Sequence, residues 1–154
     1  MSEERSVEST GMTGPLRLDI SIPSQIEHIK LVDDVVSYVL KGYEMEASER
    51  DYAGLAVHEV VANAIVHGNK EDARLYVQVS FYLHQDRIRV VVEDEGDGFD
   101  PGQLPDPTDP ANLLKPHGRG LLYVRNFMDN IIFKRGSRGM MIILEKRAPF
   151  KGLE

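Results

Sequence analysis

Residues 55–66 read LAVHEVVANAIV, a stretch that is apolar on almost every side of the helix its composition favours. Such a helix is mostly buried, so polar side chains within it need an explanation. Glu59 and Asn63 are four residues apart and therefore lie on one face. An unpaired buried carboxylate is very costly, so Glu59 must meet water, a cation or hydrogen-bond donors. Taken alone, the pair leaves two interpretations open: a structural Glu59–Asn63 hydrogen bond in the core, or a ligand site.

Further helices are predicted on both sides of this stretch. The helix that contains it is expected to open at Ser48 and to run to about Gly68. An earlier amphipathic helix is expected over residues 26–42, with Ser24 and Glu27 as its capping box. A third helix is expected from about 120 to 128, after a loop over residues 100–116 that carries five prolines.

Alternating apolar and polar residues predict the strands. They occur over residues 16–22, 75–83 and 88–92, and again in a last hairpin around 131–133 and 142–144. Because strands and helices are grouped rather than strictly alternating, the order predicts an α+β fold. We expect a two-layer sandwich in which helices cover one face of a mixed, mostly antiparallel sheet.

Length and composition limit the class of protein. A chain of 154 residues is expected to form one domain, over residues 16–147, with tails at 1–15 and 148–154. A formal charge of −7 argues against a surface that binds nucleic acid or an anionic membrane directly. The absence of cysteine excludes disulfides and thiolate chemistry. With no signal peptide or membrane span in the sequence, we expect a soluble cytoplasmic protein.

A second candidate element follows the strand at 88–92, in the sequence EDEGDGFD over residues 93–100. Glycines at a strand end allow a sharp turn and a close approach to a ligand, and the Asp94 carboxylate can accept hydrogen bonds from an exocyclic amine. The alternatives are an ordinary acidic turn or a calcium loop. The usual calcium-ligand spacing, which closes on a Glu at the twelfth position, is absent.

The third element is HGRGLL, residues 117–122, with glycines at the start of the third helix. Free backbone N–H groups there suit a phosphate chain, and Lys115, His117 and Arg119 add positive charge. The alternative for this segment alone is a flexible hinge. His67, taken by itself, is interpreted as a histidine near a helix C-terminus rather than a ligand.

Taken together and in this order, the three elements resemble those of the GHKL ATPase family. Residues 59–68 and 125–129 are most similar to the anti-sigma factor serine kinases of that family, and the resemblance covers about residues 16–146. It implies the Bergerat ATP-binding fold, and ATP and Mg²⁺ as cofactors. No Gly-x-x-x-x-Gly-Lys sequence occurs, so a P-loop enzyme is excluded.

The resemblance also implies a role for each residue. Asn63 would coordinate the Mg²⁺ that bridges the phosphates, and Glu59 would orient or deprotonate the attacking hydroxyl. Asp94 would receive the adenine amino group, while Gly96 and Gly98 would shape the base pocket. The remaining expected nucleotide contacts are His67, Lys115, Gly118, Arg119, Gly120 and Leu121.

One position departs from the family pattern. Relatives often place Gly-Thr on the last strand, where the hydroxyl helps to hold the base, but here Gly139 is followed by Met140 and Met141. We therefore expect a weaker or differently arranged adenine contact.

The function that the resemblance implies is a protein serine/threonine kinase that is also an anti-sigma factor. Its expected partners are a small STAS-domain antagonist, as substrate, and a sigma factor, and the family suggests a homodimer through the sheet. The alternative is a nucleotide-gated binding module with little or no kinase activity. The catalytic domain of a histidine kinase is disfavoured, because the chain leaves no room for a phospho-accepting helical hairpin and neither His58 nor His67 replaces one.

Overall fold

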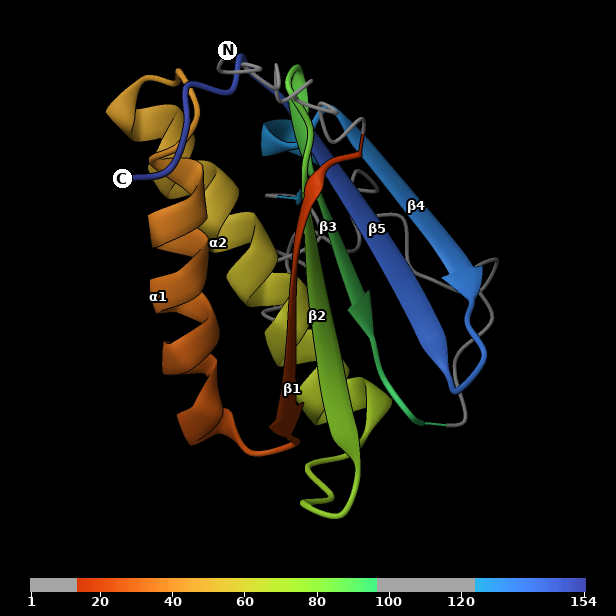
Figure 1. The fold of residues 1–154 in the computed structure, drawn as a ribbon. Coiled ribbons are helices and arrows are strands. Elements are labelled where there is room, and N and C mark those ends of the chain that lie inside the picture. Colours follow the sequence, from red (N-terminus) through yellow and green to blue (C-terminus); the bar gives the residue numbers. More distant parts are fainter. Residues whose placement is uncertain (1–13, 97–123) are drawn as a thin grey trace, which may run out of the picture.

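The computed structural model describes residues 14–96 and 124–154, which form an antiparallel sheet with helices over one face (Figure 1). The five strands pair in the order β1-β2-β3-β5-β4, and every pairing is antiparallel. Their bounds are β1 Leu16–Pro23, β2 Tyr76–Leu83, β3 Arg87–Glu93, β4 Asn130–Arg135 and β5 Met140–Arg147. The predicted α+β two-layer sandwich is confirmed, with an antiparallel sheet.

Two long helices form the second layer. They are α1, Ile29–Leu40, which follows a short 3-10 turn at Ile26–His28, and α2, Ala47–Asn63. A π-helical segment, Ala64–Gly68, continues α2, so the predicted helix does reach Gly68 but changes type on the way. A helical turn at 124–127 agrees with the end of the third predicted helix, whose start, like the proline-rich loop, lies outside the described residues.

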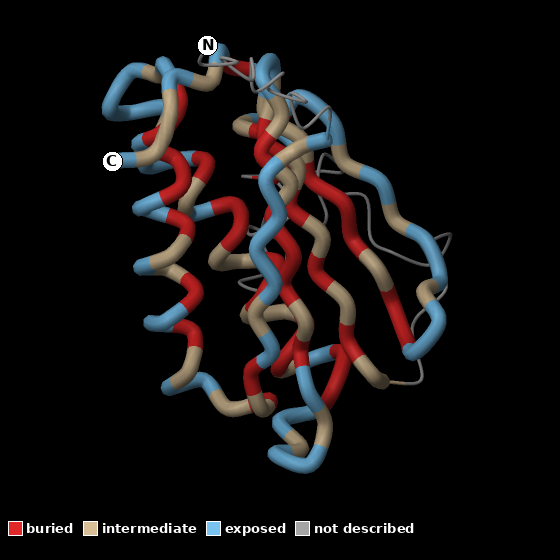
Figure 2. Tube along the Cα trace, viewed as in Figure 1, coloured by how far each residue is buried: buried red, intermediate tan, exposed pale blue. Residues whose placement is uncertain are grey.

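The core lies between the two layers, as the buried segments in Figure 2 show. Alternate residues of the strands point to the helices because the side-chain period of a strand is two. Buried side chains of the sheet include Val79, Phe81, Val90 and Leu144, and those of α1 recur at helical spacing at Val32, Val36 and Val39. These are the periodicities on which the sequence prediction rested.

The predicted capping box at Ser24 is wrong. The cap position of the first turn is Gln25, with no side-chain cap bond, and Ser24 is fully buried instead. Its hydroxyl donates to the Leu75 carbonyl oxygen at 2.7 Å, across the junction between β1 and β2. A buried hydroxyl must be hydrogen-bonded, and this tertiary acceptor replaces the local one.

Residues 148–154 pack against the helix layer. Ala148 is buried, the rings of Tyr43 and Phe150 lie 5.1 Å apart, and the Lys151 N–H donates to the Gly42 carbonyl oxygen. The hydroxyl of Tyr43, a fully buried residue, lies 2.9 Å from the carbonyl oxygens of His84 and Arg87. Burial raises the pKa of this phenol, which stays a neutral donor.

No helix in residues 14–96 and 124–154 is long and apolar enough to cross a membrane.

Candidate functional site

Glu59 and Asn63 lie one turn apart on α2, and both are half-buried. No hydrogen bond joins these two described side chains, and neither has a partner elsewhere in the described parts of the chain. The interpretation in which they satisfy each other inside the core therefore loses its support. A carboxylate and a carboxamide are left facing the same partly open flank of the helix.

The π-helical segment carries this flank toward the sheet. Its defining bond runs from the Asn69 N–H to the Ala64 carbonyl oxygen, 2.8 Å, which is one residue longer than an α-helical bond. It brings Gly68 against Asp94, so closely that a Cβ added at position 68 would overlap the carboxylate. The path along the helix from Glu59 to Gly68 is about 14 Å at the usual helical rise.

Asp94, which follows β3, is the one buried residue with a charged side chain in the described parts of the chain, 4% exposed. Its Oδ1 accepts hydrogen bonds from the backbone N–H groups of Gly96 and Met140, each at 3.1 Å. Burial raises the pKa of the Asp94 carboxyl, and the nearby Glu93 adds to the rise, while these two bonds oppose it. The carboxylate is thus rigidly held, and both of these bonds use the same oxygen.

Three glycines surround this turn because side chains would not fit. A Cβ at Gly96 would overlap the Gly68 carbonyl oxygen, and one at Gly139 would lie 2.5 Å from the Asp94 oxygens. Distances below 3.0 Å force something to shift, here backbone or the carboxylate itself. Gly68 and Gly139 therefore belong to the site, although the sequence singled out only Gly96 of the three for it.

Asn69 is the residue that sequence reasoning missed. It is 2% exposed, and its side chain donates to the Ser24 hydroxyl and the Tyr76 carbonyl oxygen while accepting from the Glu95 N–H. The sequence offers only a polar residue directly after Gly68, where the helix is expected to end. None of its partners is a neighbour along the chain, so the sequence alone did not reveal the network.

The structure thus brings together Gly68, Asp94 and Gly96 where the π-helical segment meets the end of β3. Asn63 is the last residue of α2, directly before that segment. His67 is exposed on the π-helical segment. The other predicted contacts lie outside the described residues: Gly98, Lys115, Gly118, Arg119, Gly120 and Leu121.

An aromatic stack connects α2 with the chain that follows residue 123. The rings of Tyr52 and Phe127 are parallel within 5°, with centroids 4.1 Å apart. Tyr52 lies two turns before Glu59, on the same side of the helix. The helical turn at 124–127, whose Val124 is fully buried, is therefore held against the helix that carries the candidate acid and amide.

A separate groove of about 430 Å³ lies between α1 and α2. His58 and Asp33 meet there, with the His58 Nδ1 3.0 Å from both carboxylate oxygens. His58 and Asn63 are five residues apart, so they lie on different sides of α2. The groove is consequently on a different side of α2 from Asn63, and Asp94 does not line it.

Comparisons with known proteins match this chain to one ATPase domain family and to serine-protein kinases. A family model described as the histidine kinase-like ATPase domain matches residues 22–146. The serine-protein kinase RsbW of Bacillus subtilis (strain 168) is 28% identical over 135 residues, which cover 84% of this chain and 84% of that protein. RsbW of Staphylococcus aureus (strain MSSA476) is 26% identical over 136 residues, 84% of this chain and 85% of that one.

A solved structure has a similar fold. It contains the RsbU and RsbW domains of Rv1364c from Mycobacterium tuberculosis, with a TM-score of 0.62 and 19% sequence identity. The match covers 88% of this chain but 32% of that one, so the present chain corresponds to about a third of it. At this identity the likeness concerns the fold alone.

Proposed function

Since the chain belongs to the histidine kinase-like ATPase domain family, we propose that it is an ATP-dependent protein serine/threonine kinase that also acts as an anti-sigma factor. Its substrate would be a Ser or Thr of a small STAS-domain antagonist, and it would work in the cytoplasm. The similarity to serine-protein kinases over 84% of the chain supports this choice of reaction.

The observation that carries the proposal is the placement of Glu59, Asn63 and Asp94. The first two share a half-buried flank of α2 without bonding to each other, and Asp94 lies where the same helix ends against the sheet. An acceptor for the base at one end and an acid and an amide at the other fit a nucleotide laid along the helix. Phosphoryl transfer needs positioning and charge neutralisation more than covalent help.

Each residue then has a chemical task. Asp94 would accept a hydrogen bond from the exocyclic amine of adenine, and Asn63 would supply a carboxamide oxygen to Mg²⁺. Magnesium commonly takes few protein ligands together with phosphate oxygens and water, which fits a single half-buried amide. When bound, the ion would neutralise phosphate charge. Glu59 would take the proton of the attacking hydroxyl as that oxygen bonds to the γ-phosphorus of ATP and the bond to the bridging oxygen breaks, with ADP as the leaving group.

Radiolabelled ATP mixed with the protein and a STAS-domain antagonist from the same organism tests the reaction. We expect label on the antagonist, lost in Glu59→Gln while ATP still binds. Glu49→Gln, an exposed glutamate in the first turn of the same helix, is the matched control and should transfer label normally. ATP binding without transfer in the unaltered protein would favour the nucleotide-gated binding module, and absence of ATP binding would refute both functions.

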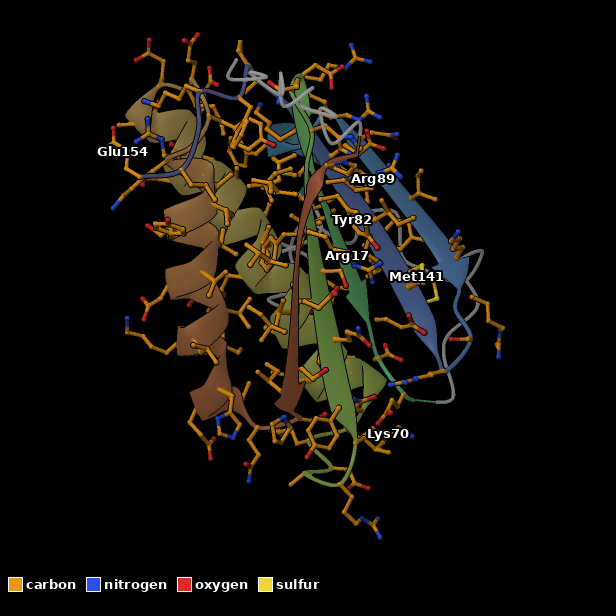
Figure 3. The ribbon with its side chains drawn as sticks, viewed as in Figure 1. Arg17, Lys70, Tyr82, Arg89, Met141 and Glu154 are labelled. Carbon is orange, nitrogen blue, oxygen red and sulfur yellow. The ribbon has the colours of Figure 1, made fainter. Side chains whose placement is uncertain are left out.

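The open face of the sheet supports a homodimer as part of this proposal. No helix of the described residues covers it, and its middle row runs through Val91, Ile143 and Ile132, with Ile132 39% exposed. Arg17, Tyr82 and Arg89, labelled in Figure 3, and Glu145 are paired across the strands two residues along from this row. The Arg17 guanidinium lies 5.0 Å from the centre of the Tyr82 ring, and Arg89 pairs with Glu145 at 2.9 Å. An apolar centre with a polar margin is the pattern of a protein interface.

The sigma factor is the second proposed partner. Phosphorylation of the antagonist would disrupt its interface by adding charge, and the kinase surface would then be free for the sigma factor. Purification of the tagged chain with ADP or with ATP tests this exchange, since we expect the antagonist with ADP and the sigma factor with ATP.

A further inference from the structure

Asn69 lies where four separate parts of the chain meet. It directly follows the π-helical segment, and its side chain contacts the junction after β1, the start of β2 and the turn after β3. Lys70, the next residue, is labelled in Figure 3 on the loop that leads to β2. At 2% exposure, Asn69 has no access to solvent that would replace these contacts.

The Asn69 carboxamide makes three hydrogen bonds, which engage both its nitrogen and its oxygen. Nδ2 donates to the Ser24 Oγ at 2.7 Å and to the Tyr76 carbonyl oxygen at 3.0 Å, and Oδ1 accepts from the Glu95 N–H at 2.8 Å. Both Nδ2 protons and one lone pair of Oδ1 are therefore engaged. A buried amide satisfied in this way holds its partners in one arrangement.

The bonds close into a ring around the turn. Asn69 binds the Tyr76 carbonyl oxygen, the Tyr76 N–H donates to the Glu95 carboxylate at 2.7 Å, and the Glu95 N–H returns to Asn69. Asp94 precedes Glu95 directly, and its carboxylate rests on Gly68, which precedes Asn69. The position of the Asp94 carboxylate relative to the helix end thus depends on the Asn69–Glu95 bond.

We propose that Asn69 is the positioning residue of the base pocket: it holds the Asp94–Gly96 turn at the distance from the helix end that lets Asp94 accept the adenine amino group. The proposal rests on the proposed function. Asn69 touches no nucleotide in this scheme and acts through Asp94. Since guanine carries a carbonyl oxygen where adenine carries that amine, the preference for ATP over GTP measures how well Asp94 is placed.

Titration of ATP and GTP into the unaltered protein, Asn69→Ala and Ser24→Ala tests this role. We expect Asn69→Ala to reduce the ratio of ATP to GTP affinity about tenfold, the scale of one buried hydrogen bond. Ser24→Ala removes a different Asn69 partner and leaves the Glu95 bond intact. We expect Ser24→Ala to lower the melting temperature but to leave the ratio of ATP to GTP affinity unchanged. If Asn69 were only structural, both variants would change the ratio in the same way as they change stability.

Two further variants keep the test decisive. Asn130→Ala, at an exposed asparagine, is the matched surface control and should change neither quantity. If Asn69→Ala does not fold, Asn69→Ser replaces it, because a hydroxyl remains near Ser24 but is too short to reach Glu95. The same loss of ratio is expected.

The failures are distinguishable. An unaltered protein that binds no ATP, or binds ATP and GTP equally, would overturn the role of Asp94 and this inference with it. A normal preference that persists in the Asn69 variants, or is lost equally in Ser24→Ala, would overturn the inference and leave the proposed function in place.

Discussion

Gly68, at the end of the π-helical segment, packs its Cα against the carboxylate of Asp94, which follows β3. This contact joins the helix that carries Glu59 and Asn63 to the turn that contains Asp94 and Gly96. It leaves no space for a side chain at position 68, because the nearest atoms belong to a carboxylate that backbone hydrogen bonds hold in place. The two halves of the candidate site therefore depend on a glycine.

Gly68→Ala should displace Asp94 and weaken ATP binding. We expect it to destabilise the fold by about 1–3 kcal/mol, the usual effect of overpacking. The matched control is Gly54→Ala on α2, where the nearest atom, Val36 Cγ1, lies 3.9 Å from the added Cβ. Alanine there should stabilise the protein by about 0.5–1 kcal/mol. Urea unfolding and ATP titration measure both effects, and unchanged ATP affinity in Gly68→Ala would contradict the placement of the site.

Asp94→Asn should increase the stability of the fold and decrease the affinity for ATP. Burial raises the pKa of Asp94, so the folded protein binds this proton more tightly than the unfolded chain does. The contribution of Asp94 to the free energy of unfolding therefore falls as the pH rises above 3.8, the ordinary pKa of an aspartate side chain. An asparagine oxygen can still accept from Gly96 and Met140. We expect the variant to gain stability relative to the unaltered protein from about pH 4 toward neutrality, and to lose ATP affinity.

Urea unfolding at a series of pH values measures this difference. Asp51→Asn, at an exposed residue of α2, controls for the change in net charge. A stability difference that shrinks with rising pH would show that Asp94 is better solvated than its surroundings indicate.

The stack of Tyr52 on Phe127 should contribute to stability as a pair. In a double-mutant cycle with alanine at both positions we expect a coupling of about 0.5–1.5 kcal/mol, typical of aromatic pairs. Tyr52→Phe keeps the ring and should retain the coupling. Tyr38, an exposed tyrosine on α1, is the control partner for Phe127 and should show none. Additive effects of Tyr52 and Phe127 would mean that the turn at 124–127 is held by other contacts.

Ile132→Lys should weaken the proposed dimer, because it places a charge in the apolar row of the open sheet face. Sedimentation velocity over a range of concentrations should show a dissociation constant raised at least about tenfold, the scale expected for one buried apolar side chain. Leu31→Lys, at a residue of α1 that is 55% exposed, is the control and should leave self-association unchanged. A dimer unaffected by Ile132→Lys would have to form elsewhere.

The strands and helices were predictable because their signals are local. Alternation along residues 16–22 and 75–83, and helical spacing in α1, predict which side of an element faces the core. The structure confirms this for β2 and α1, whereas in β1 only Ile22 is buried and Leu16 and Leu18 remain exposed. The placement of Glu59 and Asn63 on one flank of α2 follows from the helical repeat in the same way. Their roles in catalysis and metal binding, like those of the other nucleotide contacts, stay predictions.

What the sequence did not predict are side-chain contacts between residues that are far apart in the sequence. Glu27 follows Ser24 by three positions, as a capping box requires, yet the Ser24 hydroxyl donates to the carbonyl oxygen of Leu75, 51 residues away. Asn69 directly follows the predicted end of the helix at Gly68, and its side chain joins residues 45 positions before it and 26 after it. A side chain that has local and distant options takes the one that leaves no buried polar group unpaired.

The amino-acid sequence by itself determined the α+β class, the order of the elements and the helix face that carries Glu59 and Asn63, because these depend on periodicity within short segments. Only the tertiary structure decided that Gly68 meets Asp94 and that Asn69 holds the turn beside it. Those contacts join residues from different elements, and hydrogen bonds and close packing between such elements exist only once the sheet and helices have come together.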